Sequence, residues 1–160
     1  MVFRVYIDGI FDLFHFGHVE SFRKCKAVMA ADAATPIHED DIHLVVGVIS
    51  DRDAASYKRP PIICEEHRIA MVRQSQYVND VIAKAPLIID EAFLQKHRID
   101  MVVHGFATDA DEAKQAAFFE TCKRLGKFRR IDYCTETSTT DIIHRIVARH
   151  TATTTSPESE

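Results

Sequence analysis

Two histidines after the first β-rich run mark the first place where this sequence can do chemistry. His15 and His18 are separated by Phe16 and Gly17, and a helix is predicted to begin near His18. Free N–H groups and the dipole at a helix N-terminus favour anions, and two imidazoles there can donate hydrogen bonds to phosphoryl oxygens. Gly9 and Gly17 let the backbone approach a ligand closely. The spacing therefore favours a phosphate-binding turn over two polar residues in an ordinary loop.

Two further segments carry groups that suit phosphate. Lys58 lies in the charged stretch Asp51–Pro61, which is predicted to be a loop, and a loop lysine is by composition more often solvated surface. Ser138, Thr139 and Thr140 precede an apolar run, which is an N-cap signal for a last helix. The same hydroxyls and free N–H groups can also hold phosphate, so capping and binding are compatible interpretations.

Strand-like and helix-like stretches alternate along the chain, and this order determines where those groups can meet. It predicts an α/β fold with a Rossmann-like, doubly wound parallel sheet of about five strands and helices on both faces. In such folds, ligands bind beyond the carboxyl ends of the strands. The predicted strands are Val2–Ile7, Ile42–Ile49, Val78–Ala83, Met101–His104 and Phe128–Tyr133, and the predicted helices are 18–31, 65–74, 91–97, 110–125 and 139–150. Residues 33–41 are predicted to form a loop.

Length and composition limit the class of protein. The 160 residues suit one domain, predicted over residues 1–150, followed by a Thr/Ser/Glu-rich disordered tail at 151–160. A net charge of −4 argues against broad nucleic-acid binding, which needs a basic face. No stretch approaches the ~18 apolar residues of a membrane span, and the first residues do not have the pattern of a signal peptide. The four cysteines fit no zinc spacing, so we expect free thiols in the cytoplasm.

The segment from Asp8 to His18, DGIFDLFHFGH, resembles the H-x-G-H signature of the nucleotidyltransferase superfamily. It is similar in particular to the choline-phosphate and ethanolamine-phosphate cytidylyltransferases, and the resemblance runs from Val2 to Ile146. It implies an enzyme that transfers CMP from CTP to phosphoethanolamine, giving CDP-ethanolamine and pyrophosphate for phospholipid synthesis. Phosphocholine or glycerol 3-phosphate as acceptor, and adenylyl transfer to another phosphate ester, stay open as alternatives. Further matches lie at 46–51, in the helix that contains Arg68, and at 77–81, 84–86 and 93–100.

The resemblance also implies roles for individual residues. It makes His15, His18 and Lys58 catalytic, with the imidazoles stabilising charge on the α-phosphate and the lysine closing over the triphosphate. Mg²⁺ is expected to accompany the triphosphate, and no residue is assigned as a metal ligand. The expected nucleotide-binding residues are Asp8, Gly9, Ile10, Phe11, Gly17, His104, Ser138, Thr139 and Thr140, and the expected acceptor contacts are Asp12, Lys84 and Tyr133.

The sequence departs from the family pattern R-T-x-G-x-S-T-S/T-D just before the last predicted helix. Tyr133, Cys134 and Glu136 stand where the pattern has Arg, Thr and Gly. The family arginine binds nucleotide phosphate, and a tyrosine cannot replace its charge. Arg129 or Arg130, slightly upstream, is the substitute that we expect. A weakly active, regulatory nucleotide-binding module is the alternative that this departure motivates.

Other departures bear on the acceptor. His104-Gly105 is similar to the ethanolamine-type enzymes, whereas choline-type enzymes have His-Asp-Asp here and a tryptophan at the position of Leu87. The chain has no tryptophan, and a quaternary ammonium is best held by aromatic faces. A primary ammonium can be held by carboxylates, for which Asp109 and Asp111 are candidates. The expected partners are CTP and a small phosphate ester, without nucleic acid or strong membrane binding, and the resemblance favours a homodimer.

Overall fold

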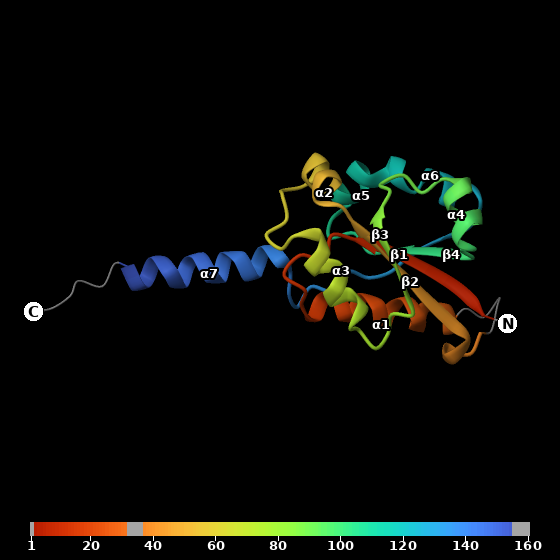
Figure 1. Cartoon of the computed structure of the whole chain (residues 1–160), viewed down its shortest axis with the longest axis horizontal. Helices are drawn as coiled ribbons and strands as arrows, with labels where there is room; N and C mark the ends of the chain where they lie inside the picture. Colours follow the sequence, from red (N-terminus) through yellow and green to blue (C-terminus); the bar gives the residue numbers. More distant parts are fainter. Residues whose placement is uncertain (1, 32–36, 155–160) are drawn as a thin grey trace, which may run out of the picture.

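A five-stranded parallel sheet forms the centre of the molecule (Figure 1). The structure, a computed structural model, describes residues 2–31 and 37–154. The strands pair in the order β3-β2-β1-β4-β5, and this confirms the α/β, Rossmann-like prediction. They are β1 (Phe3–Gly9), β2 (Ile42–Ile49), β3 (Asp80–Ala85), β4 (Met101–His104) and β5 (Phe128–Arg130).

Helices cover both faces of this sheet, as predicted (Figure 1). α1 and α3 lie on one face, and α2, α4, α5 and α6 lie on the other, while α7 extends away from the body. The helices are α1 (Phe16–Ala30), α2 (Asp51–Tyr57), α3 (Glu65–Arg73), α4 (Glu91–His97), α5 (Asp109–Gln115), α6 (Glu120–Arg124) and α7 (Thr139–Thr154), with 3-10 turns η1 (Glu39–Asp41) and η2 (Ala116–Phe118).

Alternation along β1 divides the core between the two faces. Val5 and Ile7 belong to the apolar cluster under α1, whereas Tyr6 points to the opposite face and packs edge-on against Phe93 of α4, with ring centroids 5.1 Å apart. Gly47 in β2 is needed beside this tyrosine, because a Cβ there would lie 2.1 Å from the Tyr6 hydroxyl oxygen. Both faces of the central strands are therefore buried, as is usual in a parallel sheet.

The strand order creates a crevice beside β1. The chain runs outward from β1 through β2 to β3, and it then returns to place β4 and β5 on the other side of β1. The topological switch point therefore lies between β1 and β4, where connections leave in opposite directions and a ligand can enter. Asp8, near the end of β1, and His104, at the end of β4, are at this edge.

The charge and prolines of the stretch Asp51–Pro61 predicted a loop, but only part of this stretch is a loop. Its first part forms α2, and Ser50 caps this helix by accepting a hydrogen bond from the backbone N–H of Asp53 at 3.1 Å. Acidic residues in the first turn favour the helix dipole. The prolines come only after Tyr57, so they end the helix and do not prevent it.

The single helix predicted over 110–125 is also wrong, because three short pieces, α5, η2 and α6, occupy this segment. The break lets Phe119 point inward, where it is buried and lies near the rings of Phe106 and Phe128. β5 is shorter than the predicted strand and ends at Arg130. Its partner β4 is short and ends at His104. Because His104 pairs with Arg130, β4 has no further residue that could pair with β5 beyond Arg130.

The two helices at the site edges also differ from their predicted bounds. α1 begins at Phe16, not His18, and α7 continues beyond His150 through Thr154. The predicted tail is therefore helical over 151–154, while 155–160 lie outside the described residues, as do 32–36 within the predicted loop 33–41. Among the described residues, no helix combines the length and the apolar character that crossing a bilayer requires.

Candidate active site

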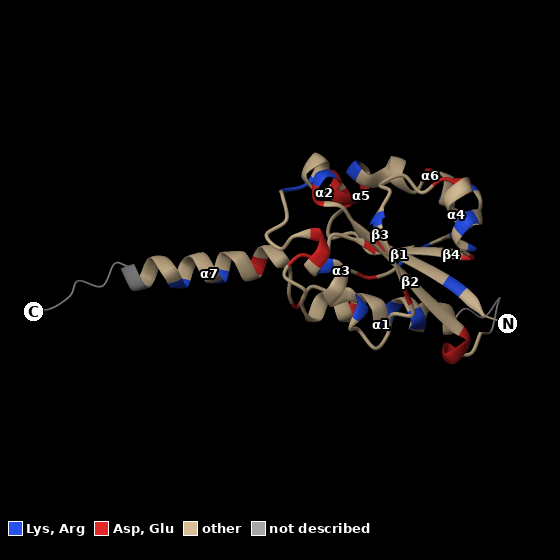
Figure 2. Cartoon of the chain, in the orientation of Figure 1, with Lys and Arg blue, Asp and Glu red and all other residues tan. Residues whose placement is uncertain are grey.

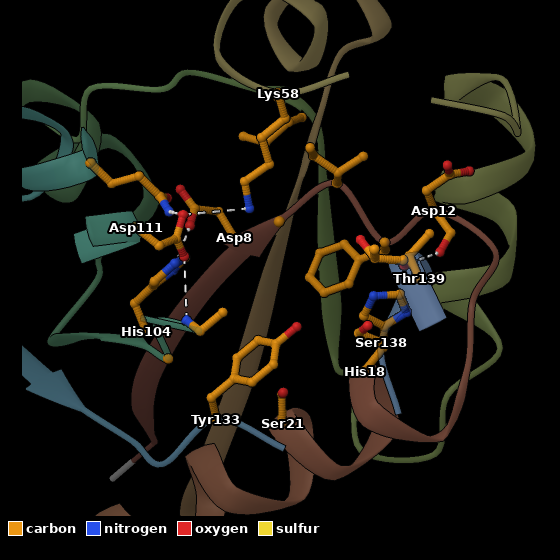
Figure 3. Close-up of a pocket in the computed structure, with 18 of the residues that line it drawn as sticks. Asp8, Asp12, His18, Ser21, Lys58, His104, Asp111, Tyr133, Ser138 and Thr139 are labelled. Carbon is orange, nitrogen blue, oxygen red and sulfur yellow. Dashed lines mark hydrogen bonds and ion pairs between the residues drawn. The ribbon is translucent and has the colours of Figure 1, made fainter. Parts of the chain in front are cut away.

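A cavity of about 740 Å³ opens at the switch point between β1 and β4 (Figure 3). Its walls come from the carboxyl ends of these strands, the first turns of α1 and α7, the segment after α2, and α5. In Figure 3, His18, Ser138 and Thr139 group on one side, which together with Thr140 we call the helix side. The opposite side, built from Asp8, His104 and Asp111, we call the acidic side.

His15 and His18 hold each other at the start of α1. His15 is the N-cap residue, and its Nδ1 accepts a hydrogen bond from the backbone N–H of Gly17 at 3.1 Å. The Nδ1 of His18 accepts in return from the backbone N–H of His15 at 3.3 Å, so the pair forms a capping box. The two rings stack with centroids 3.8 Å apart. The H-x-G-H spacing thus folds locally into a rigid turn.

These backbone bonds determine which nitrogen of each neutral imidazole carries the proton. Since Nδ1 accepts a hydrogen bond in both rings, the proton lies on Nε2. Burial and, to a smaller extent, the neighbouring His15 lower the pKa of His18 to about 3. Burial also lowers the pKa of His15, partly offset by the carboxylate of Asp141. At neutral pH both side chains are therefore neutral donors through Nε2–H.

His15 connects the start of α1 to the start of α7. Its Nε2 lies 3.2 Å from the hydroxyl of Thr139, which donates in turn to the carbonyl of Asp12 at 3.0 Å. Ser138 caps α7 by accepting from the backbone N–H of Asp141 at 3.1 Å. The predicted capping of the last helix is confirmed, and its first turn is tied directly to the histidine turn.

Asp12 braces the segment that follows α2. Its carboxylate accepts from the backbone N–H groups of Ile62 at 2.8 Å, Ile63 at 2.9 Å and Leu13 at 3.1 Å. The carboxylate is buried and already used by the backbone, so the structure favours this structural role over the expected acceptor contact.

Arg68 is a second brace, to which sequence reasoning assigned no role. This fully buried side chain of α3 donates to the carbonyls of Ile10, of Ile49 at 2.9 Å and of Ile63 at 2.9 Å. It also pairs with Asp51 at 2.7 Å. It therefore holds together the segments that leave β1 and β2 and the segment after α2. An arginine in a short polar helix looks like surface in sequence, so no local signal indicated this.

The acidic side is formed by residues from separate elements. The Nδ1 of His104 lies 3.2 Å from a carboxylate oxygen of Asp8, and the Lys58 ammonium lies 3.9 Å from Asp111 on α5 (Figure 3). Tyr57 and Tyr133 also line the cavity, and their phenols stay protonated because burial, then nearby carboxylates, raise the pKa of each. Lys58 thus reaches across the cavity toward the acidic side.

Most of the predicted site residues meet in this cavity. His15 and Gly17 lie next to the cavity-lining His18 rather than in the cavity wall as the structure describes it. Lys84 does not contact the cavity either, because its ammonium pairs with Glu65 at 2.7 Å on an exposed surface. The predicted residues that do line it are Asp8, Gly9, Ile10, Phe11, Asp12, His18, Lys58, His104, Tyr133, Ser138, Thr139 and Thr140.

Other cavity residues were missed or were assigned differently. Asp111 lines the cavity, whereas Asp109 is fully exposed and pairs with Arg130 at 3.8 Å. Arg130 also pairs with Glu112, so it does not take the place of the family arginine in the cavity wall. Arg59, to which the sequence gave no role, does line the cavity. Its position next to Lys58 was the only available signal.

An α/β sheet with a cavity of about 740 Å³ at its switch point is typical of proteins that bind a ligand beyond the carboxyl ends of their strands. A family model described as cytidylyltransferase-like matches residues 6–145, and the chain belongs to this family. It is 37% identical over 145 residues to choline-phosphate cytidylyltransferase 2 of Arabidopsis thaliana, covering 90% of this chain and 44% of that protein. It is 35% identical over 146 residues to ethanolamine-phosphate cytidylyltransferase of Dictyostelium discoideum, covering 90% of this chain and 36% of that protein.

The fold is also found in a solved structure. The lipopolysaccharide core biosynthesis protein from Thermoplasma volcanium GSS1 superposes with a TM-score of 0.61 and 24% sequence identity, over 84% of this chain and 99% of that one. At this identity the likeness concerns the fold alone. The chain spans less than half the length of the curated relatives described above.

Proposed function

We propose that this protein transfers CMP from CTP to phosphoethanolamine, giving CDP-ethanolamine and pyrophosphate. The observation that carries the proposal is the meeting of His18, Lys58 and the first turn of α7 in one cavity. Its volume of about 740 Å³ lies within the range of ~300–1,000 Å³ that is usual for small-molecule sites. Membership of the cytidylyltransferase-like family supports the same chemistry.

The reaction is an in-line displacement at phosphorus. A phosphate oxygen of the acceptor attacks the α-phosphorus of CTP, forming a new P–O bond. The bond to the β-phosphate breaks, and pyrophosphate leaves with the electron pair. A phosphomonoester is already ionised near neutral pH, so the step needs no strong general base. Catalysis therefore consists of positioning and charge stabilisation.

The histidine turn supplies the stabilisation at the α-phosphate. The Nε2–H of His18 is a neutral donor that needs no change of charge, since its pKa is far below neutrality. His15 holds that ring by stacking and by its backbone N–H, so it acts together with His18. Lys58 contributes a positive charge from the segment after α2. Such fixed donors are each worth about 10²–10³ in rate.

Mg²⁺ is proposed to enter with the triphosphate. Within the described part of the chain, no group of three or more His, Cys, Asp or Glu side chains is arranged to hold a metal ion. This fits an ion held mainly by phosphate oxygens and water, which is the usual mode for Mg²⁺. When bound, it neutralises part of the triphosphate charge.

The acidic side favours a primary ammonium as the acceptor's head group. Asp8, which the resemblance had assigned to the nucleotide, and Asp111 offer carboxylates that can accept its N–H donors. Leu87 lines the same cavity at the position where choline-type enzymes have tryptophan. A quaternary ammonium without N–H donors gains most from aromatic faces, so leucine at this position removes one such face, although Tyr57 and Tyr133 line the same cavity. Relatives named for choline phosphate and for ethanolamine phosphate are both similar to the chain, so the acceptor needs a direct test.

Product analysis provides that test. The protein is incubated with CTP and Mg²⁺ and, in separate reactions, phosphoethanolamine, phosphocholine or glycerol 3-phosphate. We expect CDP-ethanolamine to form fastest, with one pyrophosphate released per product. Faster turnover of either other ester would overturn the acceptor assignment. Replacement of CTP by ATP in the most active reaction tests whether the enzyme prefers the cytosine base.

A second candidate function is a regulatory nucleotide-binding module. Tyr133 and Glu136, in place of the Arg and Gly of the family pattern, favour it because they remove a charge and a flexible residue. This module would bind CTP by calorimetry but release no pyrophosphate with any of the three esters. Measured turnover would exclude it.

We also infer a cytoplasmic homodimer that does not bind nucleic acid. The family resemblance supports the dimer, and free cysteines are consistent with a reducing compartment. In Figure 2, Lys and Arg are interspersed with Asp and Glu over the face that is shown, in keeping with the net charge of −4. Size-exclusion chromatography with light scattering measures the molar mass of the protein in solution. A monomeric mass at micromolar concentration would contradict the proposed homodimer.

A further inference from the structure

Two basic side chains, Lys58 and Arg59, line the cavity among the described residues, and they point to opposite sides of it. Lys58 reaches the acidic side, where its ammonium lies 3.9 Å from Asp111. Arg59 turns instead to the helix side, where its Nη1 donates to the hydroxyl of Thr140 in the first turn of α7 at 3.3 Å. Neighbours in sequence thus serve different halves of the cavity.

The charge balance of the cavity makes this division important. A nucleoside triphosphate carries several negative charges, while the cavity wall already contains Asp8, Asp111 and Asp141. The ammonium of Lys58 is shared with one of these carboxylates, and the histidines are neutral. On the helix side, a guanidinium with five donors is the group best suited to bind phosphate oxygens.

We propose that Arg59 binds the β- and γ-phosphates of CTP, the part that leaves as pyrophosphate. This inference rests on the proposed function. In-line displacement places the attacking and leaving oxygens on opposite sides of the α-phosphorus. If the acidic side holds the ammonium of the acceptor, the leaving group extends away from it, toward Arg59 and the N–H groups of α7. The hydrogen bond to Thr140 positions the guanidinium there before the nucleotide binds.

The same inference accounts for Tyr133. This side chain lines the cavity but carries no charge, and Arg130 is engaged with Glu112 outside the cavity wall. Arg59 approaches the helix side from a segment distant in sequence, the one that Asp12 braces at Ile62 and Ile63. A positive charge that the family pattern places at the position of Tyr133, in the segment before α7, is supplied here from the segment after α2.

Nucleotide binding by Arg59→Gln provides the test, with Arg52→Gln as the control. Arg52 is an exposed residue of α2 that does not belong to the described cavity wall. Its substitution by Gln removes the same charge as Arg59→Gln. We expect Arg59→Gln to raise the Kd for CTP and for inorganic pyrophosphate by roughly tenfold or more, as for loss of a charged hydrogen bond. The Kd for CMP and the KM for the acceptor should change less than about twofold. Arg52→Gln should match the wild type throughout.

A second substitution that restores a positive charge in the cavity tests the same inference from the opposite direction. Tyr133→Arg, introduced into Arg59→Gln, places a guanidinium back in the same cavity and should recover most of the affinity for CTP. Equal CTP affinity of Arg59→Gln and wild type would overturn the inference, as would equal weakening of CMP and CTP. Absence of turnover in the wild type would instead refute the proposed function, while pyrophosphate binding by both proteins would still decide the role of Arg59.

Discussion

The two sides of the cavity are built in different ways. The helix side is formed by two short segments, each of which begins a helix and caps it with its own side chain. The acidic side takes Asp8 from β1, His104 from β4 and Asp111 from α5. An anion site can therefore be encoded locally, because a helix N-terminus brings its own donors, whereas a cation site here needs several elements to meet.

Arg68→Met gives the largest expected effect, since it removes the brace between the segments that leave β1 and β2 and the segment after α2. Three backbone carbonyls, of Ile10, Ile49 and Ile63, lose their donor. Each buried acceptor left without a partner costs about 1–3 kcal/mol, so we expect a loss of ~3 kcal/mol or more in unfolding free energy. Urea denaturation measures it. The control Arg73→Met, on the exposed end of the same helix, should change stability by less than ~0.5 kcal/mol.

His18→Ala breaks the helix side alone. Loss of a fixed donor to the α-phosphate should lower kcat about 10²–10³-fold with a smaller change in KM for CTP. Steady-state pyrophosphate release is the measurement. If turnover stays within threefold of the wild type, the assignment of the histidine turn to the reaction is wrong.

Asp111→Asn tests the acidic side alone. If this carboxylate faces the ammonium of the acceptor as proposed, its removal should raise the KM for phosphoethanolamine by roughly tenfold, while the Kd for CTP falls or stays unchanged because Lys58 loses its partner. The matched control is Asp109→Asn, an exposed neighbour in the same helix. A larger effect on CTP binding than on acceptor KM would mean that the two sides are not separate.

The smallest expected effect is the pH dependence of stability. The pKa of His18 is about 3 in the folded protein, whereas an unfolded histidine titrates near ~6.5. As pH falls from 6.5 toward 3, the unfolded chain binds a proton that the folded chain does not, so the stability falls. Between pH 7.5 and 5.5 the wild type should lose about 1 kcal/mol more than His18→Gln, as measured by urea denaturation. Parallel pH profiles of the two proteins would contradict the burial of a neutral imidazole.

Much of the helix side was predictable because its signals are local. The segment from Asp8 to His18 and the run Ser138–Asp141 each carry their chemistry in consecutive residues, and capping follows from residue type. The succession of strands and helices along the chain, though not their exact bounds, followed from the pattern of apolar runs. The helix within Asp51–Pro61 was missed because prolines near its end were given more weight than the capped turn at its start.

The sequence by itself determined the parallel α/β fold, through the alternation of strand-like and helix-like stretches along the chain, and the histidine turn, through a few consecutive residues. Only the tertiary structure decided that Arg59 meets Thr140, that Asp111 faces Lys58, and that Lys84 does not reach the cavity. It alone showed that Arg68 is buried. These contacts join segments far apart in the chain, and their geometry depends on strand order and helix packing, which no short stretch of sequence contains.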